Sequence, residues 1–132
     1  MKKKILAGTA LGASAAMIAA GTILAAPAQA APMDVERESR GTCSAGARWD
    51  FNLEREFGVV DIGFEIDNAK AGQKWSVRIE KNGKKILTRS YIADNDGEVD
   101  VDHLVRDSAG TDKFSVRAKS SAGQVCSASL SI

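Results

Sequence analysis

Residues 74–92, KWSVRIEKNGKKILTRSYI, carry the clearest fold signal in this chain of 132 residues. Apolar residues occupy every second position from Trp75 to Ile79, and a period of two places alternate side chains on opposite faces of a strand. The dipeptide Asn82-Gly83 accepts the positive φ angles of a type I′ turn. The stretch therefore predicts a β-hairpin, with a return strand over residues 85–92 and one face exposed to water.

The same two-residue period recurs in stretches that begin near Trp49, Val60, Phe114 and Cys126. With a short strand at residues 98–101 the count is about seven, separated by Gly, Asn and Asp turns. This spacing predicts an all-β fold, an antiparallel β-sandwich, with a small closed barrel as the alternative. The expected core is Trp49, Phe51, Leu53, Val60, Ile62, Phe64, Ile66, Trp75, Val77, Ile79, Val99, Val101, Phe114, Val116 and Leu130.

The alternation fails at one place between these stretches, residues 102–106 (DHLVR). Leu104 and Val105 are both apolar and adjacent, which a strand with one buried face does not favour. A bend or a single helical turn is predicted there.

The chain begins with the pattern of a secretory signal peptide over residues 1–30. Three lysines precede a long apolar run, which ends in a small-x-small site at Ala30. Export with cleavage after Ala30 is predicted, and an uncleaved anchor is the alternative. Residues 31–42 are polar and lack an apolar period, so a flexible lead-in is expected before a single domain over residues 43–132.

The two cysteines, Cys43 and Cys126, lie near opposite ends of that domain. In an oxidising compartment a disulfide between them is predicted, one that joins the terminal strands. Free thiols or pairing between chains are the alternatives. The chain has no CxxC motif, so neither a zinc site nor a thioredoxin-like site is indicated.

Catalytic signatures are missing from the sequence. It has no GxGxxG, P-loop or G-x-S-x-G motif, and His103 is the only histidine. An EF-hand register fails because Ile92 and His103 fall where calcium ligands are required; a looser cation site from Asp94, Asp96 and Glu98 is the alternative to a solvated turn. We expect no enzymatic activity, no cofactor and no metal.

The charge pattern bears on partners. Without the lysines of residues 1–30, 15 Lys and Arg stand against 17 Asp and Glu, a net charge of −2, which disfavours nonspecific nucleic-acid binding. Residues 70–91 carry a net +6 and residues 94–112 a net −6. Such fields can steer an anionic cell-wall polymer or a protein partner, or favour head-to-tail self-association, whereas ordinary surface charge is the plain alternative. The candidate partner-binding residues are Lys81, Lys84, Lys85 and Arg89.

Several short motifs together suggest a family. They are Cys43-Ser44, Gly72-Gln73-Lys74-Trp75, Asn82-Gly83, the run AGTDKF at residues 109–114, and Gly123 to Cys126. In these the chain resembles small secreted actinobacterial proteins of uncharacterised function with an immunoglobulin-like β-sandwich. The resemblance implies a fold and export, and it implies no activity and no site residues.

The resulting functional hypothesis is a secreted, noncatalytic binding or interaction module, extracellular or associated with the cell envelope. It should be a monomer with no membrane contact after signal cleavage. The alternative is a secreted inhibitor of a protease or other hydrolase, which would present an exposed loop on a disulfide-closed scaffold. A hydrolase that depends on His103 ranks last.

Overall fold

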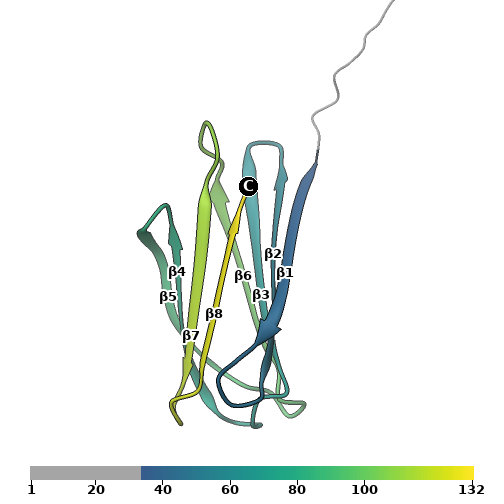
Figure 1. Cartoon of the computed structure of the whole chain (residues 1–132), viewed down its shortest axis with the longest axis vertical. Helices are drawn as coiled ribbons and strands as arrows, with labels where there is room; N and C mark the ends of the chain where they lie inside the picture. Colours follow the sequence, from purple (N-terminus) through teal and green to yellow (C-terminus); the bar gives the residue numbers. More distant parts are fainter. Residues whose placement is uncertain (1–33) are drawn as a thin grey trace, which may run out of the picture. The chain divides into compact units, whose positions relative to one another are not determined.

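The computed structural model describes residues 34–132, which form eight strands in two antiparallel sheets (Figure 1). The first sheet has the order β1-β2-β3-β6 and the second β5-β4-β7-β8. No helix occurs between residues 34 and 132. The strands are β1 (Val35–Thr42), β2 (Arg48–Glu56), β3 (Val59–Asp67), β4 (Lys74–Lys81), β5 (Lys84–Ile92), β6 (Val99–Arg106), β7 (Lys113–Ser120) and β8 (Val125–Ser131).

The two sheets share one apolar core, as the alternating pattern predicts. Phe51 and Ile62 enter it from the first sheet, and Trp75 and Phe114 enter it from the second; all four are fully buried. At one side of the sandwich the edge strands β1 and β8 lie next to each other (Figure 1). The all-β, sandwich-like fold is therefore confirmed. Of the expected core residues, Trp49 and Leu130 are only partly buried.

The N-terminal strand β1 corrects the expected lead-in. Residues 35–42 pair with β2 along their whole length, from Val35 with Arg55 to Thr42 with Arg48. The lead-in prediction is wrong there because an edge strand can keep most of its side chains in water and then shows no apolar period. Residues 31–33 and the signal peptide lie outside the described residues.

The predicted bend at residues 102–106 is also wrong, because β6 runs unbroken to Arg106. His103 pairs with the buried Ile62 and so stands on the inward side of the sheet. The neighbouring Leu104 points outward and is 65% exposed. An exposed leucine, and not a change of backbone, therefore breaks the alternation.

The hairpin of β4 and β5 has the predicted turn. Asn82 has φ 53° and Gly83 has φ 82°, both in the left-handed region that a type I′ turn requires. The register shifts at Ile79/Glu80, where a bulge interrupts the ladder. Beyond the bulge, Lys85 stands opposite Glu80 on the outer face of the sheet.

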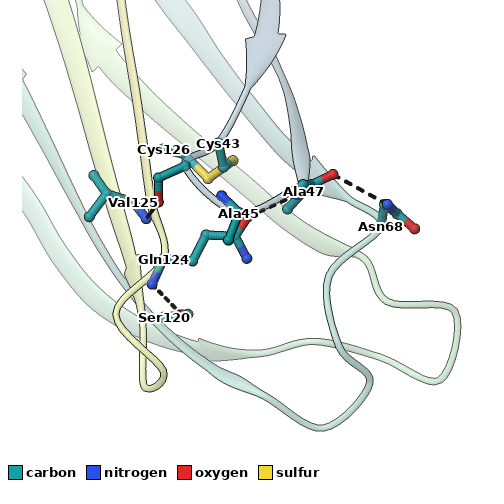
Figure 2. Close-up of a disulfide and its surroundings, with 10 residues drawn as sticks. Cys43, Ala45, Ala47, Asn68, Ser120, Gln124, Val125 and Cys126 are labelled. Atoms are coloured by element: carbon teal, nitrogen blue, oxygen red, sulfur yellow. Dashed lines mark hydrogen bonds between the residues drawn. A yellow bond between two sulfur atoms is a disulfide. The ribbon is translucent and has the colours of Figure 1, made fainter.

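The predicted disulfide joins Cys43, in the loop after β1, to Cys126 in β8. Figure 2 shows Gln124 reaching from the β7–β8 turn to the same loop, where its Oε1 accepts the N–H groups of Ala45 at 3.1 Å and Ala47 at 2.8 Å. The covalent link and these hydrogen bonds hold the β1–β2 loop against β8.

Among the described residues there is no helix of the length and apolar character needed to cross a membrane.

Candidate binding face

The outer surface of the second sheet is basic. Strand pairing lines up the outward residues of β4, β5, β7 and β8, because their neighbours along each strand point into the core. Among these outward residues six are basic and Glu80 is the single acid, and most of the others are serine. We call this surface the basic face. Its cations are Lys74, Arg78, Lys85, Lys113, Arg117 and Lys119.

The outer surface of the first sheet is acidic, by the same alternation. Ten acidic residues point outward from it, against the three bases Arg40, Arg48 and Arg106. We call this surface the acidic face. Its acids are Glu36, Glu38, Asp50, Glu54, Glu56, Asp61, Glu65, Asp67, Asp100 and Asp102.

A shallow hollow of about 500 Å³ lies on the basic face. Arg78 and Arg117 stand directly opposite each other across β4 and β7 and both line it, together with Lys113 and several serines. Arg78 donates from Nε to Glu80 Oε2 at 2.8 Å, whereas no salt bridge involves Lys113 or Arg117 within residues 34–132. Like charges opposite each other on a sheet repel. An anion placed between them would relieve that repulsion.

The serine hydroxyls add neutral donors to this hollow. Ser115 lies between Lys113 and Arg117 on β7, and Ser129 stands opposite it on β8 with the two Oγ atoms 3.5 Å apart. Hydroxyl groups can donate to phosphate or carboxylate oxygens. The surface therefore combines fixed positive charge with short donors, which suits an anionic ligand bound at the surface.

The four sequence-predicted residues do not come together. Lys81 is 14% exposed and donates from Nζ to Arg106 O at 2.8 Å and Ser108 Oγ at 2.7 Å, so its ammonium group is already bound inside the protein. Lys84 is exposed at the end of the hairpin, and Lys85 alone belongs to the basic face. Arg89 pairs with the buried Val77 on the inward side of β5.

Arg89 also has a partner of its own. Its guanidinium carbon lies 5.6 Å from the centroid of the Tyr91 ring, a cation–π distance. Alternation along β5 thus sends Arg89 and Lys85 to opposite sides of the strand. The basic residues of segment 70–91 are close in sequence but do not share one surface of the folded protein.

Sequence reasoning missed the β7 members of the basic face, Lys113, Arg117 and Lys119. Their position on one face could have been predicted, because these residues alternate with Phe114, Val116 and Ala118. They lie outside the basic segment of residues 70–91. A search for charge on one face of each expected strand would have found them.

The acidic turn at residues 94–98 is organised by its own backbone. Asp94 Oδ1 accepts the N–H groups of Asp96 and Glu98, each at 2.9 Å, and so closes the turn. The acids that approach one another are Glu65, Asp67 and Glu98, with one oxygen of each lying within 4.8 Å of the others. Burial and then the charges of neighbouring carboxylates raise the pKa of Glu65 and that of Glu98.

Comparison with known proteins found no match: no family model matches the chain, and neither a curated protein nor a solved structure matches it. The resemblance to small secreted actinobacterial proteins therefore stays a prediction. The basic face is the feature of the described residues that bears on function.

Proposed function

We propose that the protein is an exported, noncatalytic binding module with an immunoglobulin-like fold, and that its basic face binds an anionic polymer of the cell wall. The observation that carries the proposal is the surface of six cations and one acid around a serine-lined hollow. Clustered cations raise the local concentration of an anionic ligand and favour its binding. The disulfide supports the extracellular location, since such bonds persist in oxidising compartments.

The strand order supports the immunoglobulin-like part of the proposal. Strands β2-β3-β6 take the places of A, B and E in an immunoglobulin domain, and β4-β7-β8 take those of C, F and G. Strand β5 pairs with β4 as an additional C′ strand does, and the buried Trp75 lies on the strand that corresponds to C. The disulfide differs from that pattern, because it joins the β1–β2 loop to β8.

The test is binding of the purified protein to two soluble probes, inorganic polyphosphate and polyglutamate, which separate phosphate from carboxylate recognition. The variant Arg78→Ser/Lys113→Ser/Arg117→Ser removes the cations of the hollow. Three exposed contacts of up to about 1 kcal/mol each predict a loss of about 10- to 100-fold in affinity. Binding should also weaken as salt is raised.

A charge-matched control separates this site from general attraction. Arg37→Ser/Lys70→Ser/Lys84→Ser removes the same charge from exposed positions off the basic face. It should keep most of the wild-type affinity. Equal losses in the two triple variants, or no binding by the wild type at low salt, would refute a site on the basic face.

The inhibitor alternative keeps the same scaffold but lacks a comparable observation. The loop beside the disulfide closes on itself, with the N–H of Cys43 donating to the Ala47 carbonyl at 2.7 Å. Its exposed residues Ala45 and Gly46 thus form a compact turn, not an extended segment that a protease could bind. Inhibition stays a prediction that a panel of secreted proteases would test.

A further inference from the structure

The basic and acidic faces are opposite outer surfaces of one sandwich, and each is made by a four-stranded sheet. Ten acids against three bases give the acidic face a net charge of −7; six bases against one acid give the basic face +5. The chain as a whole is almost neutral. A second copy therefore carries a surface complementary to either face.

The rows of charge on the two faces also have the same spacing. On the acidic face Asp50, Glu65 and Asp100 form one row across β2, β3 and β6. On the basic face Arg78 and Arg117 form a row across β4 and β7. Neighbouring strands in any sheet lie about 4.8 Å apart, so adjacent cations of one copy can meet adjacent carboxylates of another.

The acidic row lies in a hollow of its own, of about 320 Å³, which Asp50, Glu65, Asp100 and Asp102 line. Gly63 and Asn52 also line it, and the side-chain oxygen of Asn52 occupies the space that a Cβ on Gly63 would take. Long lysine and arginine side chains from the basic face of another copy would reach into such a space. Their charges would offset the mutual repulsion of the carboxylates.

We propose that copies of this protein stack head to tail, with the basic face of one copy on the acidic face of the next. The two surfaces differ and lie on opposite sides of the sandwich, so the contact is heterologous and leaves a free face at each end of a stack. The attraction acts between exposed charges, so it operates at low ionic strength and is screened by salt. A polyanion on the basic face would compete with stacking.

Two face variants test this proposal. Arg78→Gln/Lys113→Gln/Arg117→Gln lowers the net charge of the basic face from +5 to +2. Glu65→Gln/Asp100→Asn/Asp102→Asn reduces that of the acidic face from −7 to −4. Sedimentation velocity near 10 mM ionic strength, where the Debye length is about 30 Å, gives the readout. The wild type should show a sedimentation coefficient that rises with concentration. Each variant alone should show a much smaller rise, because one of its two faces has lost three charges.

The decisive sample is an equimolar mixture of the two variants. Each keeps a different face unchanged, so the basic face of one variant can bind the acidic face of the other. The mixture should therefore associate more strongly than either variant alone, with dimers of one copy of each as the main product. A monomeric mixture would overturn the proposal, and so would a wild type that stays monomeric at high concentration and low salt. Association that persists at about 1 M salt, where the Debye length is near 3 Å, would contradict it as well.

The stacking proposal and the polymer-binding proposal can be refuted separately. The variant with the three substitutions on the acidic face keeps every cation of the basic face, so it should still bind polyphosphate. If this variant loses stacking but still binds the polymer, the proposed function stands. Circular dichroism of both variants should show the β-rich spectrum of the wild type, which excludes misfolding as the cause of any loss.

Discussion

Replacing Lys81 with methionine should destabilise the protein, because this side chain neutralises a buried carboxylate. Asp112 has a side chain 2% exposed, and Lys81 Nζ lies 3.8 Å from its Oδ2. The carboxylate also accepts a hydrogen bond from Asn82 Nδ2 at 2.9 Å and one from the N–H of Ser108 at 3.3 Å. The group ties the β4–β5 turn to the loop before β7.

The size of the effect follows from this geometry. Removing one partner of a buried ion pair costs about 3–5 kcal/mol. Two hydrogen bonds to Asp112 remain in Lys81→Met, and the Lys81 side chain is 14% exposed, so the lower end, about 3 kcal/mol, is expected. For a domain of this size that lowers the melting temperature by about 12 °C or more.

Urea unfolding followed by tryptophan fluorescence measures the change. The matched control is Lys84→Met, three residues further along the same hairpin, where the side chain is exposed; it should stay within about 0.5 kcal/mol of the wild type. Adding Asp112→Asn to Lys81→Met removes the unpaired charge and should recover part of the loss. Equal stability of Lys81→Met and Lys84→Met would refute a structural role for Lys81.

Three further changes have expected outcomes. The double variant Cys43→Ser/Cys126→Ser opens a link across 83 residues, and chain entropy predicts a loss of up to about 4.5 kcal/mol in urea unfolding. A Cβ on Gly41 would lie 2.5 Å from Cζ2 of Trp49, so Gly41→Ala should cost about 1–3 kcal/mol by the same assay, and an unchanged midpoint would contradict the packing of β1. Burial and neighbouring carboxylates raise the pKa of Glu65, so the folded chain binds this proton more readily than the unfolded chain and stability should rise as pH falls from neutral through the raised pKa. Glu65→Gln should raise the melting temperature at pH 7 and flatten that dependence, whereas a lower melting temperature would show that the charge is stabilising.

Much of the fold could be predicted from the sequence because a strand with one buried face alternates apolar and polar residues. The rhythm from Trp75 to Ile79 and the Asn82-Gly83 turn are local features, and the structure keeps them. Strand β1 could not be predicted in this way, since its contribution is backbone pairing along β2 and its side chains stay mostly in water. Leu104 misled for the opposite reason, as an apolar side chain that is exposed.

The candidate site was harder to predict, because a binding face is made by register between strands. Arg78 and Arg117 lie 39 positions apart in the sequence and become neighbours only through the pairing of β4 with β7. The sequence alone gave no sign that Lys81 is unavailable to a ligand. Its hydrogen bonds to Arg106 O and Ser108 Oγ are formed only in the folded protein. A charge count along the chain could indicate an anionic partner but not the surface that meets it.

A titration of the isotope-labelled protein with inorganic polyphosphate, followed by two-dimensional NMR, tests the basic face most directly. Amide shifts should concentrate at Arg78, Ser115, Arg117 and Ser129, with the strands of the acidic face little changed. Shifts centred on the acidic face, or on the hairpin around Lys84, would contradict it.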